Sequence, residues 1–184
     1  CVPNGMDDPD NPPTWSDITP GSHDGAARVA VLDEEGIERS LLFPSMYLLS
    51  GDIADVEVAA AACHAYNEWI SDMCRDGSGR LDAVGLVPLQ SVAAATKEVA
   101  HIAQLGLKGV LFRPERYNGL ALHDAALAPF WNAVADQGLF AAVHGSFGAH
   151  MPSFANSRYT DTFFTHMVCH PFEQMAACLD LVCG

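Results

Sequence analysis

The sequence predicts an α/β fold built on a parallel sheet. Short apolar segments alternate with longer segments of helical periodicity, the apolar segments run into proline or a polar residue, and most helical segments stop at glycine. A parallel neighbour is reached only by crossing over the sheet, so this alternation indicates right-handed β/α units in series. Two architectures satisfy the pattern: a doubly wound open sheet and an arc of a (β/α)8 barrel.

Regular structure is expected to begin at Asp24. Residues 1–22 are rich in Pro, Asp, Asn and Gly, which predicts a loop or extension. Asp24 is a residue type that caps helices, and the helix after it is expected to end at Gly36. We expect residues 1–184 to form a single partial barrel domain.

Four β/α units follow this first helix. The expected strands are the apolar runs 39–44, 83–88, 109–113 and 139–144. The expected helices start near 52–55, 91 and 124 and end at Gly77, Gly106 and Gly138; a last one has Pro171 in its first turn and ends at Gly184. Residues at helical spacing are expected to face inward, among them Cys63, Trp69, Trp131, Phe172, Met175, Cys178 and Leu179.

Composition excludes several classes of function. The net charge of −14 leaves no basic patch for phosphates, so nucleic acid is not an expected partner, and an acidic surface repels anionic membranes. No apolar stretch has the length of a membrane span. The six cysteines form no C-x-x-C pair, which favours a reducing, cytoplasmic location.

Polar residues at the carboxyl ends of the expected strands are the candidates for a ligand site, because ligands bind at that edge in both architectures. These residues are Ser45, Gln90, Arg113, Glu115, His144 and Ser146. His144 follows five apolar residues, so it lies at a strand tip, where an imidazole binds a metal, acts as a base or bonds to nearby backbone. Arg113 can hold a substrate carboxylate or pair with Glu115 or another acid.

Other motifs do not support a site. His166 and His170 are four residues apart, but no glutamate lies between them and Pro171 suggests that a helix restarts there. The sequence has no Walker A motif, no G-x-G-x-x-G and no nucleophile elbow at Ser146. His64 and His101 lie within helical patterns and are expected to be packing or surface residues.

A series of phrases resembles the amidohydrolase-related family that includes aminocarboxymuconate semialdehyde decarboxylase. The phrases are Pro20-Gly21-Ser22-His23-Asp24, Leu42-Phe43-Pro44-Ser45, Val87-Pro88-Leu89-Gln90, Gly109-Val110-Leu111-Phe112-Arg113-Pro114, Ala142-Val143-His144 and His170-Pro171-Phe172-Glu173-Gln174-Met175. The resemblance covers nearly all of the chain beyond residue 20 and rests on their order and spacing. It implies a partial (β/α)8 TIM barrel of the metal-dependent hydrolase type, with the four strands as about strands 2 to 5.

The resemblance also implies a function. His144 matches the fifth-strand histidine that binds a divalent metal, expected to be zinc, in this family. The family's first-strand H-x-H pair and its later histidine and aspartate are not found in the chain, which is therefore expected to be an inactive piece of the enzyme. The expected reaction is hydrolysis or non-oxidative decarboxylation of a small, carboxylated substrate, with Arg113 as a substrate-binding residue.

Two other interpretations remain open from the sequence. One is a barrel that binds a small molecule without a metal, and the other is a remnant without activity. A half-barrel leaves strand edges unpaired, so a homo-oligomer is an expected partner state.

Overall fold

The computed structural model describes residues 14, 17–45, 50–145, 158–159 and 161–184. The chain divides into two compact units. One holds Cys1–Leu41 and Asp72–Asp82, and the other holds Leu42–Ser71 and Ala83–Gly184. The long helix α2 (Val56–Asp76) and the strand β2 (Leu81–Leu86) run from one unit into the other.

The first unit is organised around helix α1 (Gly25–Glu35), preceded by the short 3-10 helix η2 (Pro20–Ser22). Asp24 caps α1 by accepting a hydrogen bond from the amide of Ala27 at 2.7 Å, and Gly36 ends it with a left-handed φ of 68°. Both ends of this helix are therefore confirmed. Arg80 then secures the chain after the helix, donating to the carbonyl of Ile37 at 2.7 Å and to that of Glu38 at 2.9 Å.

The sheet has the strand order β1-β2-β3-β4, with β1 at Ser40–Leu42, β3 at Gly109–Phe112 and β4 at Phe140–Val143. The pairs β2-β3 and β3-β4 are parallel. In a doubly wound sheet the strand order reverses at a switch point, whereas an arc of a barrel keeps the order of the sequence. The described strands thus have the order of a partial (β/α)8 barrel, as expected.

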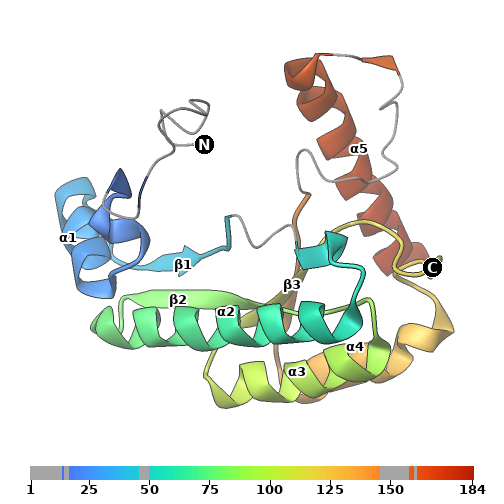
Figure 1. The fold of residues 1–184 in the computed structure, drawn as a ribbon, viewed down its shortest axis with the longest axis horizontal. Helices are drawn as coiled ribbons and strands as arrows, with labels where there is room; N and C mark the ends of the chain where they lie inside the picture. Colours follow the sequence, from blue (N-terminus) through green and yellow to red (C-terminus); the bar gives the residue numbers. More distant parts are fainter. Residues whose placement is uncertain (1–13, 15–16, 46–49, 146–157, 160) are drawn as a thin grey trace. The chain divides into compact units, whose positions relative to one another are not determined.

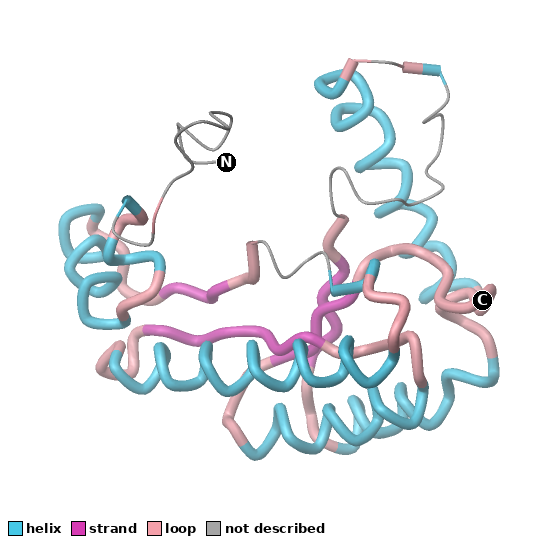
Figure 2. Tube along the Cα trace, in the orientation of Figure 1, coloured by secondary structure: helices cyan, strands magenta, loops and turns pink. Residues whose placement is uncertain are grey.

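Helices α2, α3 (Val92–Gln104) and α4 (Ala128–Asp136) follow the strands in turn, and α4 is preceded by the 3-10 helix η4 (Ala125–Leu127). Figure 1 shows α3 and α4 side by side, and Figure 2 shows the strands above them. The second unit's core is apolar and tightly buried; its fully buried members include Cys63, Val84, Val99, Ile102, Val110, Leu127 and Phe130. No helix in the described part of the chain has the length and apolar character needed to cross a membrane.

The last helix, α5 (Thr162–Cys183), corrects the expectation that a helix starts at Pro171. Asp161 caps it by accepting hydrogen bonds from the amides of Phe163 and Phe164 at 2.8 and 3.3 Å. Pro171 therefore lies inside the helix, where its ring removes one backbone hydrogen bond without ending the helix. The acidic cap, more than the proline, determines where this helix begins.

The burial expected for three side chains of α5 is also wrong. Phe172, Met175 and Leu179 are 47%, 65% and 63% exposed. The small residues Cys169 and Ala177 are buried instead. The apolar periodicity is present in α5, but the side of the helix that packs in the second unit carries small side chains.

Helical periodicity predicts the burial of single side chains only in part. Trp131 packs against Phe112 and Phe130, and its indole donates to the carbonyl of Leu122 at 2.8 Å, so its packing role is confirmed. Trp69 is 40% exposed and Cys178 is exposed, so both predictions of burial are wrong. Trp69 comes directly before the buried Ile70, so a shift of one position along the helix moves a side chain from the core to the surface, whereas Cys178 lies near Met175 on the exposed side of α5.

The buried thiol of Cys63 is expected to make the protein less stable as pH rises in the alkaline range. Burial raises the pKa of Cys63 to about 12, opposed by a hydrogen bond from Ser50 and assisted by the negative charge of Glu98. Above the ordinary value of 9.0 the unfolded chain loses this proton and the folded chain keeps it. We expect the free energy of unfolding to fall by up to about 1.4 kcal/mol per pH unit in that range.

Urea unfolding of the wild type and of Cys63→Ala, measured across this alkaline range, checks this prediction. The variant lacks the titrating group, so its stability should fall less steeply with pH. Equal slopes for the two proteins would contradict the prediction.

Candidate functional site

The ends of β3 and β4 bring Arg113 and His144 to the same edge of the sheet. Phe112 pairs in register with Val143, and the amide of His144 donates to the carbonyl of Phe112 at 3.0 Å. Arg113 and His144 are the next residues along the two parallel strands. The predicted common edge of strand tips is therefore present in the second unit.

The ring of His144 is held in one orientation by backbone. Its Nδ1 lies 2.6 Å from the carbonyl oxygen of Gly145, so Nδ1 carries the proton and donates it. The other ring nitrogen, Nε2, then has its lone pair available for a metal ion or a proton. His144 is half-buried, and Phe43 lies 6.5 Å from it between ring centroids. This geometry suits a metal ligand, although the role itself stays a prediction.

Helix α5 places two further residues beside His144. The ring of His170 is 6.0 Å from that of His144 between centroids, in an edge-on arrangement. One turn later, Gln174 with its amide oxygen towards Gly145 accepts from the Gly145 amide and donates to the carbonyl of Val143 at 3.3 Å. A Cβ atom on Gly145 would lie 2.6 Å from His170 Nδ1, so only glycine allows this approach. Gln174 thus fixes α5 to the end of β4.

The sequence interpretation missed His170 as a neighbour of His144. It placed His170 before the helix, whereas α5 carries His170 and Gln174 on one face, four residues apart. The cap at Asp161 was the signal that could have shown this. The side chain of His166, the other member of the rejected pair, lies outside the described residues.

Arg113 is buried and paired with two carboxylates. The whole residue is 3% exposed, and its guanidinium donates to Asp52 at 2.8 Å and to Glu115. Burial alone lowers the pKa of Arg113, but the hydrogen bonds and negative charges of these two acids outweigh it and hold the pKa above its usual value. A Cβ atom on Gly51 would lie 2.9 Å from Arg113 Cζ, so the loop before α2 packs directly on the guanidinium.

This pairing is the one that the sequence analysis offered as the alternative to substrate binding. Glu115 is one of the partners, and Asp52 is the second. Both acids contact the Nη2 atom of Arg113, so a substrate carboxylate would compete with them for the same buried guanidinium. That role stays a prediction.

Of the other residues at strand ends, Gln90 binds the loop before α2, and Ser45 is exposed to solvent. Gln90 donates from Nε2 to the carbonyls of Ser50 and Ile53 at 2.8 and 3.1 Å. Ser45 is exposed, and Ser146 lies outside the described residues. Gln90 and Arg113 therefore hold residues 50–53 against the strand ends.

Known structures share this fold. A 2,6-dihydroxybenzoate decarboxylase from Rhizobium matches with a TM-score of 0.72 and 22% identity, over 84% of this chain and 49% of that one. The 5-carboxyvanillate decarboxylase of Sphingomonas paucimobilis matches with a TM-score of 0.70 and 18% identity, over 84% and 45%. A dihydroxybenzoic acid decarboxylase from a Polaromonas species, with bound manganese and the inhibitor 2-nitroresorcinol, matches with a TM-score of 0.68 and 20% identity, over 84% and 48%.

The chain spans about half the length of the structures it matches. At these identities the likeness shows the fold, which is that of a partial barrel. No curated protein matches the sequence. The model of the amidohydrolase family, however, matches residues 11–176, which is most of the chain. The predicted resemblance is confirmed, and the chain belongs to the amidohydrolase family.

Proposed function

We propose that the full-length protein is a metal-dependent enzyme of the amidohydrolase type that decarboxylates or hydrolyses a small, carboxylated substrate. The observation that carries the proposal is His144, at the carboxyl end of β4 with Nδ1 committed to the Gly145 carbonyl. Family membership and the decarboxylases that share the fold support it. The 184 residues alone are proposed to be inactive.

His144 fits a metal ligand because its tautomer directs the lone pair to Nε2. A divalent ion bound there would supply a Lewis acid that polarises a substrate carboxylate or a water molecule. The Polaromonas decarboxylase has bound manganese, whereas zinc is the metal expected from the sequence resemblance. A single imidazole does not make a tight site, so the remaining ligands are proposed to come from residues other than those described.

The chain's own residues would organise this site in two ways. Gln174 and Gly145 hold the end of β4 and leave room for His170, so that a second imidazole lies beside the proposed metal ligand His144. Arg113 is proposed to act on the substrate carboxylate by exchanging one of its acidic partners. Association into a homo-oligomer and a cytoplasmic location stay predictions.

Metal content and turnover of the full-length protein test the proposal. The substrates are 2,6-dihydroxybenzoate and 5-carboxyvanillate, with CO2 release as the readout and elemental analysis for zinc and manganese. Loss of an outer-shell partner of a metal ligand costs about 10–100-fold, so His144→Ala should lower activity by more than about 100-fold and remove one equivalent of bound metal.

His123→Gln is the matched control, because His123 is a surface histidine whose Nδ1 pairs with Asp180 at 3.3 Å. Its metal content and activity should equal those of the wild type. If His144→Ala keeps both its metal and its activity, His144 has no such role. An active protein that holds no metal would support a barrel that works without one.

A further inference from the structure

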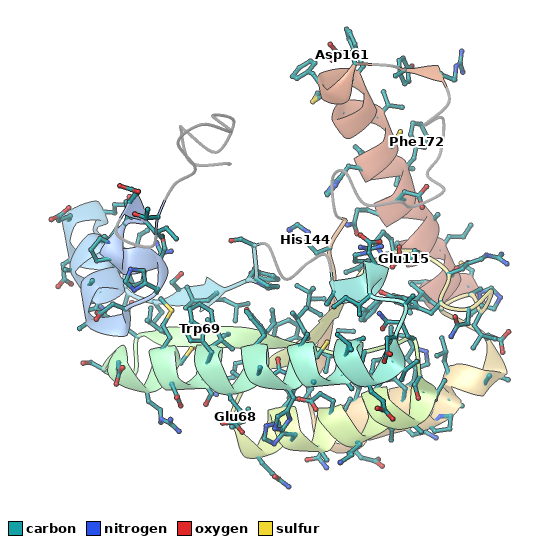
Figure 3. All side chains as sticks on the ribbon, viewed as in Figure 1. Glu68, Trp69, Glu115, His144, Asp161 and Phe172 are labelled. Carbon is teal, nitrogen blue, oxygen red and sulfur yellow. The ribbon has the colours of Figure 1, made fainter. Side chains whose placement is uncertain are left out.

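Three potential ligand side chains converge between α2 and α3, on helices and away from the strand ends. His64 and Glu68 lie one turn apart on α2, and His101 comes from α3. One ligand atom from each lies within 4.8 Å of the others. Figure 3 shows Glu68 on the helical side of the unit and His144 beyond the opposite side of α2. The group, called here the interhelical cluster, is thus distinct from the proposed His144 site.

The Nε2 atom of His101 is the most informative atom of the interhelical cluster. It is buried, and no described residue forms a hydrogen bond with it. Glu68 Oε1 lies 2.9 Å away, which is ion-pair distance but out of line for a hydrogen bond. A buried, unprotonated imidazole nitrogen beside a carboxylate oxygen is unfavourable, because two acceptors then face each other without a hydrogen between them. A cation bound by both atoms removes this cost.

Glu98 sets the tautomer of His64. One oxygen of its carboxylate accepts from Asn67 Nδ2 at 2.8 Å, and the other lies 3.3 Å from His64 Nδ1. Because both oxygens are acceptors, Nδ1 is the protonated nitrogen and Nε2 is left as the nitrogen that can bind a cation. A carboxylate behind a histidine is the usual outer-shell support of a metal ligand. The rings of His64 and His101 stack with centroids 4.2 Å apart and planes 25° apart, so the two histidines already contact each other, and one ion binds both after the exposed His64 ring turns.

We propose that His64, Glu68 and His101 form a binding site for a divalent transition-metal ion of the zinc type. Two imidazoles and one carboxylate are a donor set that zinc accepts, with a fourth position for water. At metal–ligand distances of about 2.0–2.2 Å, ligand atoms of a tetrahedral ion lie about 3.3–3.6 Å apart. The 4.8 Å span therefore has to contract, which the exposed side chain of His64 and the half-exposed side chain of Glu68 allow.

Charge supports the same occupant. With neutral imidazoles, Glu68 and Glu98 bring two negative charges to the interhelical cluster, and Glu98 is 7% exposed. A divalent cation neutralises them. The ion would join α2 to α3 on the outside of the unit, so its expected effect is on stability more than on catalysis.

Calorimetric titration of the 184-residue chain with zinc chloride near neutral pH tests the proposal. Cys178 and Cys183 are exposed and are replaced by serine in every protein, as is Cys1, because free thiols also bind zinc. One equivalent of zinc is expected to bind and to raise the melting temperature. Glu68→Gln and His101→Gln should weaken binding by at least about tenfold and remove the rise in melting temperature.

His123→Gln and His144→Ala are the controls and should bind zinc as the parent does, which separates this site from the proposed His144 site. Glu98→Gln gives a sharper test, since its amide keeps an acceptor for Asn67 but presents N–H groups to His64 Nδ1. The proton then moves to Nε2, and zinc affinity should fall by about 10–100-fold while the fold, followed by circular dichroism, is kept. No saturable binding, or equal binding by Glu68→Gln and the parent, would overturn the proposal.

Discussion

Arg113→Met is expected to lower the free energy of unfolding by about 3–5 kcal/mol, the cost of removing one partner from a buried ion pair. The guanidinium is the common donor to Asp52 and Glu115, whose side chains are 28% and 13% exposed. Without it, two negative charges face each other behind Gly51 with little water to screen them. The measurement is urea unfolding of the 184-residue chain, with the full-length protein used if the variant does not fold alone.

The triple variant Asp52→Asn, Arg113→Met, Glu115→Gln separates charge from packing. It removes all three charges, so we expect it to recover most of the stability that Arg113→Met loses. In the full-length enzyme this comparison also tests the predicted substrate role. If Arg113→Met keeps normal stability and raises KM alone, Arg113 is a substrate-binding residue and not the centre of a structural network.

The sequence predicts most of the fold because helix and strand limits depend on local chemistry. Asp24 and Ser91 cap their helices with side-chain oxygens, and Gly36, Gly106 and Gly138 take left-handed φ angles at or just after helix ends, all as expected. Apolar runs of four or more residues mark the strands β3 and β4. The predicted start of α5 is wrong because the helix begins at the cap residue Asp161 and continues through Pro171.

The sites were harder to predict because they depend on contacts across the chain. His144 and Arg113 were found from their place after an apolar run, but Asp52, the partner of Arg113, is 61 residues away in sequence. His64 and His101 were expected to be packing or surface residues because each is the single histidine of its helix. Only the packing of α2 on α3 brings them into stacking contact. Periodicity indicates which face of a helix is buried, but not which polar side chains meet between two helices.

Asn67 shows how a polar residue on an apolar helix face can serve the core. It is fully buried on α2, and its side-chain amide pairs with the backbone of β2 as a neighbouring strand would. Its Oδ1 accepts from the amide of Leu86 at 2.7 Å, and its Nδ2 donates to the carbonyl of Leu86 at 2.9 Å and to Glu98 at 2.8 Å. Gly85 leaves room for it, since a Cβ atom there would lie 3.1 Å from Asn67 Oδ1.

Asn67→Ala should therefore lower the free energy of unfolding by at least about 3 kcal/mol, because a backbone amide, a carbonyl and a carboxylate oxygen lose their partner, at about 1–3 kcal/mol for each buried group. Ser71→Ala is the matched control. Ser71 lies one turn later on the same face, is 3% exposed, and makes one hydrogen bond, to the carbonyl of Leu105 at 3.3 Å. Its loss should cost about 0.5–1.5 kcal/mol. Urea unfolding of the two variants decides the matter: if Asn67→Ala costs no more than Ser71→Ala, the three bonds of Asn67 do not hold β2 to its helix.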